Sequence, residues 1–140
     1  MPGNVVFLDT NGWLALLNAS DQLHPLADAI WRDLGQQRYS IVLTDWIIAE
    51  TGNGLARTGA RDRFCHITEA MLNDPVCRVV FINPVLLRRT LDLYLARKDK
   101  QWGLVDSASF IVMADEHIAE ALTTDRHFEQ AGFKTLLPVP

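Results

Sequence analysis

The stretch VVFLDTN (residues 5–11) decides the fold, because an apolar, β-branched run ends abruptly in a carboxylate and two small polar residues. Such a run predicts a buried strand over residues 4–8. A side chain that directly follows a buried parallel strand lies at the carboxyl edge of the sheet, where open α/β sheets bind their ligands. Asp9 is therefore predicted to belong to a ligand site at that edge.

Three further acidic residues stand at the ends of apolar runs. Glu50 closes WIIA, Asp106 follows GLV and Asp125 follows ALTT. Carboxylates that meet at one sheet edge repel one another unless a cation joins them. Ligands that are all oxygen favour a hard divalent ion such as Mg²⁺ or Mn²⁺. The pattern predicts a metal-dependent enzyme acting on phosphate esters, with Asp9 and these three residues as its metal-binding and catalytic groups.

Strand signals and helix signals alternate along the chain. This alternation predicts a three-layer α/β fold with a largely parallel sheet flanked by helices. The length of 140 residues predicts a single domain, 1–140. Thr10 or Asn11 is predicted to cap the first helix, and Asp106 the helix that follows it. The predicted strands are 4–8, 39–43, 78–82, 120–124 and 133–137. The predicted helices are one through residues 13–17, one through residues 47–55 that Thr44 or Asp45 would cap, and 25–34, 60–73, 84–98, 106–117 and 126–131.

Composition is that of a globular, cytoplasmic protein. Hydrophobic residues make up 49% of the chain, and no apolar run approaches the ~20 residues of a membrane span. The N-terminal residues lack the pattern of a signal peptide. The only cysteines, Cys65 and Cys77, are predicted to be free, reduced core thiols and not a zinc site.

The net charge of −4 at first argues against a nucleic-acid partner, but its distribution changes that conclusion. Asp and Glu number 17 against 13 Lys and Arg, so the whole excess is as large as the four proposed ligands. Bound cations would cancel it. Three basic clusters could each meet a phosphate backbone, although any one taken by itself is more typical of a solvated helix face. They are Arg57, Arg61 and Arg63; Arg88 and Arg89; and Arg97, Lys98 and Lys100.

Four segments together resemble the PIN-domain family, in particular its VapC-like toxin ribonucleases. They are VVFLDTN, WIIAE, GLVDSASF and ALTTDRHFEQAGF, in the family's order and spacing over essentially the whole chain. The resemblance implies a Rossmann-like fold and an acidic quartet that binds Mg²⁺ or Mn²⁺ to hydrolyse RNA phosphodiester bonds. It also implies products with 5′-phosphate ends, an antitoxin partner and a homodimer. Asp9, Glu50 and Asp106 match the family's three central acids, and Asp125 matches its more variable fourth.

Each acidic residue also has a structural interpretation. Asp9 and Asp106 could cap helices, and Asp125 could form an Asx turn. Glu50 is harder to explain structurally, because it is predicted to lie on a mostly buried helix where an unpaired Glu is costly. The side chains predicted to orient these carboxylates or their waters are Thr10, Asn11, Ser107 and Thr124.

Other polar and aromatic residues carry weaker signals. His127 is predicted to lie on the surface, and Trp102 to pack in the core, with stacking on a base as its alternative. Asp21 and His24 resemble a loop feature of the family whose role the sequence leaves open.

Two other function classes compete with the nuclease. A phosphatase or phosphotransferase that phosphorylates Asp9 would usually carry a second Asp two residues later, where this chain has Asn11. A PIN-like module that binds RNA or protein without cutting would not need the intact acids.

Overall fold

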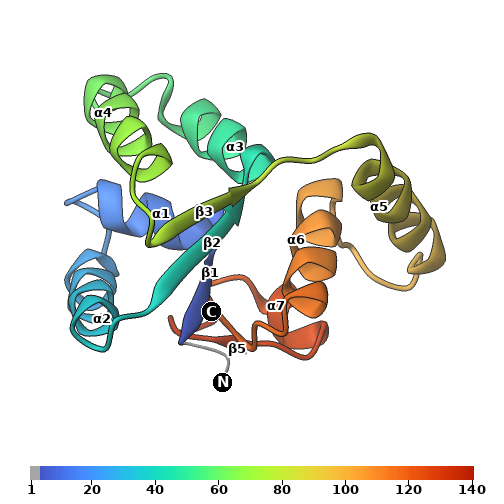
Figure 1. Ribbon diagram of the computed structural model, residues 1–140. Coiled ribbons are helices and arrows are strands. Elements are labelled where there is room, and N and C mark those ends of the chain that lie inside the picture. The colour runs from blue at the N-terminus through green and yellow to red at the C-terminus, as the bar shows by residue number, and fades with distance from the viewer. Residues whose placement is uncertain (1–3) are drawn as a thin grey trace.

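The computed structural model describes residues 4–140, whose strands form one five-stranded, fully parallel sheet (Figure 1). The strand order is β3-β2-β1-β4-β5. The α/β fold predicted from the sequence is therefore confirmed. The strands are β1 (Val5–Leu8), β2 (Ser40–Thr44), β3 (Cys77–Val80), β4 (Glu120–Leu122) and β5 (Lys134–Thr135).

Helices cover both faces of the sheet and complete the three layers (Figure 1). One side carries α1 (Thr10–Leu17), α2 (His24–Gln36), α3 (Asp45–Leu55) and α4 (Arg61–Leu72). The other side carries α5 (Pro84–Ala96), α6 (Leu104–Asp115) and α7 (Arg126–Gln130). Within residues 4–140, no helix is both long enough and apolar enough to span a membrane.

The central strands are buried on both faces, which explains their continuous apolar sequence. Phe7, Leu8, Leu43 and Leu122 are at most 1% exposed. Such burial contributes roughly 1.5–3 kcal/mol for each side chain of this size. The hydrophobic core therefore holds β1 and β4 rigidly side by side.

The strand order reverses direction at β1, and this reversal positions the site. β1 pairs with β2 on one side and with β4 on the other, with Leu8 opposite Leu122. Ligands of open α/β sheets bind in the crevice at such a switch point, outside the carboxyl ends of the strands. Asp9 and Thr123, the next residues of the two strands, therefore enter the crevice together, and the Asp9 N–H donates to the Leu122 carbonyl at 3.3 Å.

Gly12 allows α1 to lie directly against the end of β4. A Cβ atom added at Gly12 would lie 2.0 Å from the carbonyl oxygen of Leu122, a contact that no side-chain rotation relieves. We expect Gly12→Ala to lower the free energy of unfolding by about 3 kcal/mol. Gly35→Ala is the matched control, because nothing lies within 4 Å of its added Cβ, and it should raise stability slightly. Urea denaturation of both variants checks this, and an unchanged Gly12→Ala midpoint would contradict the packing.

Several element boundaries differ from the prediction. Helix α1 begins at Thr10, with Asp9 at its N-cap, so the predicted capping by Thr10 or Asn11 is wrong. Helix α6 begins at Leu104 with Gly103 at its N-cap, which places Asp106 in the first turn and not at the cap. The last strand is reduced to two residues, because only Lys134 and Thr135 find partners on β4.

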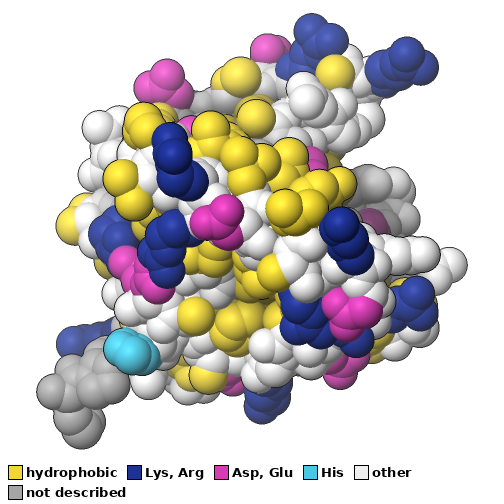
Figure 2. Space-filling model, turned by 90° about the vertical axis from the view of Figure 1, so that its right-hand side faces the viewer, with side chains coloured by type: hydrophobic (Ala, Val, Ile, Leu, Met, Phe, Trp, Pro, Cys, Tyr) yellow, Lys and Arg dark blue, Asp and Glu magenta, His cyan; other side chains and the backbone are white. Residues whose placement is uncertain are grey.

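Helix α5 packs against α6 and leaves its outer side open to solvent. It buries only Leu86 and Thr90, whereas Val85 is 70% exposed and Leu95 64%. Figure 2 faces this side of the molecule and shows hydrophobic side chains gathered over it, with Lys and Arg around them. Cys65 is likewise exposed, so its predicted place in the core is wrong, although both cysteines are free as predicted.

Candidate metal centre

Asp9 directly follows β1 at the carboxyl edge of the sheet and is 4% exposed. Its Oδ2 accepts a hydrogen bond from the Thr123 hydroxyl at 2.7 Å, and its side chain makes no cap hydrogen bond to α1. Burial raises the pKa of Asp9 from 3.8 to about 7, an effect that Thr123 and the Thr10 N–H oppose and that the nearby Asp106 and Asp125 reinforce. A carboxyl group held this far from its ordinary pKa in a crevice is typical of a functional site.

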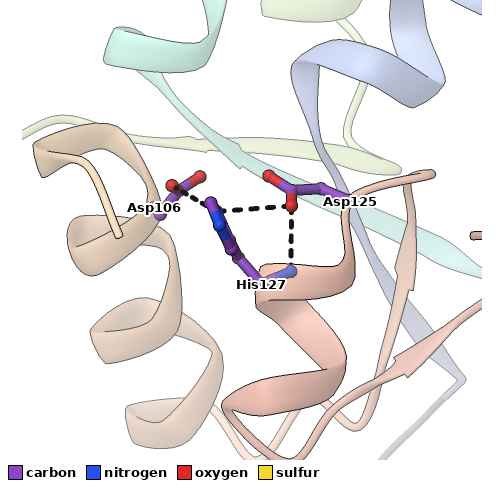
Figure 3. A group of neighbouring side chains, drawn as sticks. All are labelled: Asp106, Asp125 and His127. Atoms are coloured by element: carbon purple, nitrogen blue, oxygen red, sulfur yellow. Dashed lines mark hydrogen bonds and ion pairs between the residues drawn. The ribbon is translucent and has the colours of Figure 1, made fainter. Parts of the chain in front are cut away.

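Asp106 and Asp125 face each other across the crevice with His127 between them (Figure 3). The His127 Nδ1 lies 3.3 Å from Asp106 Oδ2 and 3.3 Å from Asp125 Oδ1. One ligand atom from each of the three residues lies within 4.8 Å of the other two. The predicted surface position of His127 is therefore wrong, since its ring is half-buried in the acidic site.

Local backbone geometry aims both of these carboxylates. Asp106 Oδ2 accepts from the Gly103 N–H at 3.0 Å, the return bond of a capping box in the first turn of α6. Asp125 Oδ1 accepts from the His127 N–H at 2.9 Å and caps α7. Burial raises the pKa of Asp106, and Asp125 adds to the rise while the Gly103 and His127 contacts oppose it.

Glu50 lies on α3, and it is not buried as predicted. Its side chain is exposed, and its Oε1 accepts from the Thr10 hydroxyl at 2.6 Å. This bond ties the first residue of α1, which follows Asp9 in the chain, to the middle of α3. Because Glu50 is exposed to solvent, its charge carries no burial cost that a cation would have to offset. A metal ion is instead indicated by the mutual proximity of Asp9, Asp106 and Asp125.

The side chains predicted to orient the carboxylates divide into two groups. Thr10 does so, through Glu50, whereas Asn11 is exposed and the Ser107 hydroxyl donates to the Gly103 carbonyl of its own helix. Among residues 4–140, Thr123 and not Thr124 supplies the hydroxyl that binds Asp9.

The role of Thr123 was not predicted, because its partner Asp9 follows a different strand. The pairing register of β1 and β4, which brings the two residues together, cannot be read from the sequence. His127 had a readable signal, since it stands two residues after Asp125 at the start of a helix, within reach of an Asx hydrogen bond.

The other residues singled out in the sequence, Trp102, His24 and Asp21, have structural roles. Trp102 is 7% exposed and its indole N–H donates to Gln130, which confirms packing over stacking. His24 Nδ1 lies 2.9 Å from the Ala15 carbonyl, and Asp21 accepts from the Leu23 N–H, so both tie down the loop between α1 and α2.

Removal of the Thr123 hydroxyl should shift the pH dependence of any activity that needs ionised Asp9. Without this donor the Asp9 pKa rises, so the carboxylate is protonated and activity is lost at a higher pH as the pH falls. We expect Thr123→Val to move the acid limb of the kcat/KM profile upward by about one pH unit. Thr123→Ser keeps the donor and should restore the wild-type profile; an unshifted Thr123→Val profile would show that Asp9 does not limit activity.

The donor set fits a divalent cation. Carboxylate oxygens suit Mg²⁺, Mn²⁺ and related ions, and a cation would offset the repulsion among Asp9, Asp106 and Asp125. The residue after β1, the first turn of α6 and the start of α7 thus together form a candidate metal centre.

The fold and this acidic edge define the class of protein. The sequence model of the PIN-domain family matches residues 6–134, and the chain therefore belongs to that family. This confirms the resemblance found in the sequence.

Individual proteins within and beyond this match resemble the chain along most of its length. The chain is 28% identical over 135 residues to the 23S rRNA-specific endonuclease VapC20 of Mycobacterium tuberculosis, with 96% of this chain and 99% of that protein aligned. The crystal structure of M. tuberculosis VapC20, a sarcin–ricin loop cleaving toxin, matches with a TM-score of 0.80 at 26% identity, over 91% of this chain and 95% of that one. VapBC2 from Rickettsia felis, bound to a DNA fragment from its promoter, matches with a TM-score of 0.62 at 14% identity, over 94% and 96%, and supports the fold alone.

Proposed function

We propose that this chain is a metal-dependent endoribonuclease and the toxin component of a toxin–antitoxin pair. Asp9, Glu50 and Asp106 are its central catalytic and metal-binding residues, and Asp125 completes the set. The observation that carries the proposal is the buried Asp9, with its pKa raised to about 7, beside two further carboxylates at the switch point of a PIN-domain sheet. The likeness to a ribonuclease along nearly its whole length supports the same activity.

Each acidic residue of the site has a separate proposed role. Asp9, held by Thr123, and Asp106, held by Gly103, present fixed oxygens to the reaction site, so little reorganisation is needed when charge develops. Glu50 accepts a hydrogen bond from Thr10, the residue that follows Asp9 in the chain. A bound divalent cation supplies the positive charge that neutralises the phosphodiester and makes an attacking water more acidic. Asp125 and His127 stand beside Asp106, where they can orient that water or the leaving oxygen.

The ion is proposed to be Mg²⁺ or Mn²⁺. Oxygen donors predominate and suit both, while the imidazole of His127 favours Mn²⁺ where it takes part.

Three partners belong to the proposal. The substrate is RNA, and 23S rRNA is the first to test because VapC20 is specific for it. A cognate antitoxin would restrain the enzyme, with an Arg as the side chain best suited to pair with the carboxylates. The chain is proposed to act in the cytoplasm as a homodimer, whose mass light scattering would measure.

The phosphotransferase alternative is less well supported. Asp9 Oδ2 is engaged by Thr123 in a 4%-exposed position, and Asn11, where such enzymes would carry a second Asp, is exposed. Trapping with beryllium fluoride separates the two classes, because a nuclease without an aspartyl-phosphate step should not bind it.

Inducible expression in a bacterium, followed by sequencing of RNA 5′ ends, tests the proposed function. We expect growth to slow and new 5′-phosphate ends to appear at one or a few positions in structured RNA. Asp106→Asn should remove both effects, whereas Asp74→Asn, a change in an exposed acid before β3, should leave both. Unchanged growth together with unchanged 5′ ends would refute the toxin function.

A further inference from the structure

A basic pocket opens directly beside the metal centre. It has a volume of about 390 Å³ and lies between the C-terminal end of α5 and the start of α6. Its lining includes Tyr94, Arg97, Lys98, Lys100, Trp102 and Gly103. Gly103 connects the pocket with the metal centre, because it lines the pocket and its N–H donates to Asp106 of the metal centre. A ligand in the pocket would therefore lie next to whatever is bound at the acidic crevice.

The floor of the pocket is rigid. Trp102 is 7% exposed, meets Phe110 edge to face at 4.9 Å and donates to Gln130 at 3.0 Å. The guanidinium of Arg97 lies over the Trp102 ring, 4.8 Å from its centroid, and is fixed by two hydrogen bonds to Asp99. Because these groups are already ordered, a ligand would lose little conformational entropy by binding to them.

The walls combine free positive charge with an exposed aromatic ring. Asp99 offsets the charge of Arg97, but Lys98 and Lys100 form no ion pair with any acid among residues 4–140. Tyr94 is 49% exposed at the end of α5. In a chain of net charge −4, two unpaired ammonium groups beside an acidic crevice create a local positive region.

These features match one nucleotide of a single RNA strand. Unpaired Lys side chains bind backbone phosphates, and an exposed aromatic ring stacks on a base of any sequence. The volume falls within the roughly 300–1,000 Å³ of small-ligand pockets. An acidic peptide would also meet the lysines, but nothing about a peptide explains why the pocket adjoins the crevice where a phosphodiester must bind.

We infer that this pocket binds the nucleotide next to the scissile phosphate of a single-stranded RNA segment, with Lys98 and Lys100 on its phosphate and Tyr94 on its base. The inference rests on the proposed function for the identity of the crevice, but RNA binding by the pocket can be measured without any cleavage.

The test measures binding of a fluorescent single-stranded RNA oligonucleotide to the full chain in EDTA, at several salt concentrations. The double variant Lys98→Glu/Lys100→Glu should bind at least tenfold more weakly and should reduce the slope of log K against log salt by about 1.4. Tyr94→Ala should weaken binding about tenfold with an unchanged slope, because stacking releases no counterions.

Arg32→Glu/Lys134→Glu is the charge control, since it makes the same change of charge on α2 and on β5, neither of which lines the pocket. It should bind RNA with nearly wild-type affinity. Melting temperatures confirm that all variants are folded.

Wild-type affinity in the Lys98→Glu/Lys100→Glu variant overturns the inference, as does an equal loss in the control. Unchanged RNA binding with lost binding of an acidic peptide would assign the pocket to a protein partner and overturn it equally. If wild-type protein binds RNA through the pocket but never cleaves it in Mn²⁺, the proposed function fails while RNA binding by the pocket stands.

Discussion

Asp9→Asn protein is expected to lose RNA cleavage by roughly a thousandfold while becoming more stable than the wild type at pH 8. The loss follows from the position of Asp9 beside Asp106 and Asp125, where an amide cannot supply the anionic oxygen that the cation requires. The amide oxygen can still accept from Thr123, so the local hydrogen bond survives. A cleavage assay and urea denaturation in EDTA together measure both effects.

The gain in stability follows from linkage. The pKa of Asp9 is about 7 in the folded protein and near 3.8 in the unfolded chain, so the folded state binds the proton more tightly. Stability therefore falls as the pH rises from about 4 to about 7, by up to about 4 kcal/mol in total. Asn does not ionise and avoids this loss. The variant should gain most at pH 8 and almost nothing at pH 4.

Glu69→Gln is the control for this experiment, because it removes the charge of an exposed acid on α4 far from the crevice. It should leave both cleavage and the pH dependence of stability as they are. Full cleavage by Asp9→Asn protein would show that the proposed site is wrong. A loss of cleavage without any gain in stability at pH 8 would instead show that burial raises the pKa of Asp9 less than to about 7.

Mn²⁺ is expected to raise the melting temperature by about 8–10 °C at 100 times its dissociation constant. Binding of this strength adds about 2.7 kcal/mol to the folded state, and a domain of this size gains a few degrees for each kcal/mol. The effect should be larger at pH 8 than at pH 6, because below its pKa of about 7 Asp9 holds a proton that the ion must displace. Thermal unfolding over a series of Mn²⁺ concentrations measures the shift.

Variants separate the roles within the metal centre. Asp106→Asn should abolish most of the Mn²⁺ shift, and His127→Ala should weaken Mn²⁺ binding by about 10–100-fold, as expected of a residue that orients the ligands. His66→Ala, an exposed residue on α4, should have no effect. Ca²⁺ should stabilise the protein without supporting cleavage, since its looser coordination positions water poorly. A melting temperature that does not respond to millimolar Mn²⁺ in wild-type protein would count against a metal centre.

The sequence by itself determined the order of strands and helices, the parallel sheet and the family. These features depend on local patterns, since a buried parallel strand must be apolar along its length and the residue after it must leave the core. The same reasoning placed Asp9 and Asp125 at the carboxyl edge of the sheet.

Only the tertiary structure decided which side chains meet. The pairing of Leu8 with Leu122 brings the Thr123 hydroxyl to Asp9, and a shift of one residue would send it to the other face. The start of α6 at Leu104 turns Asp106 toward His127, while the packing of α1 on α3 leaves Glu50 solvated and bound to Thr10. Contacts across elements depend on register and helix phase, which no local pattern of residues specifies.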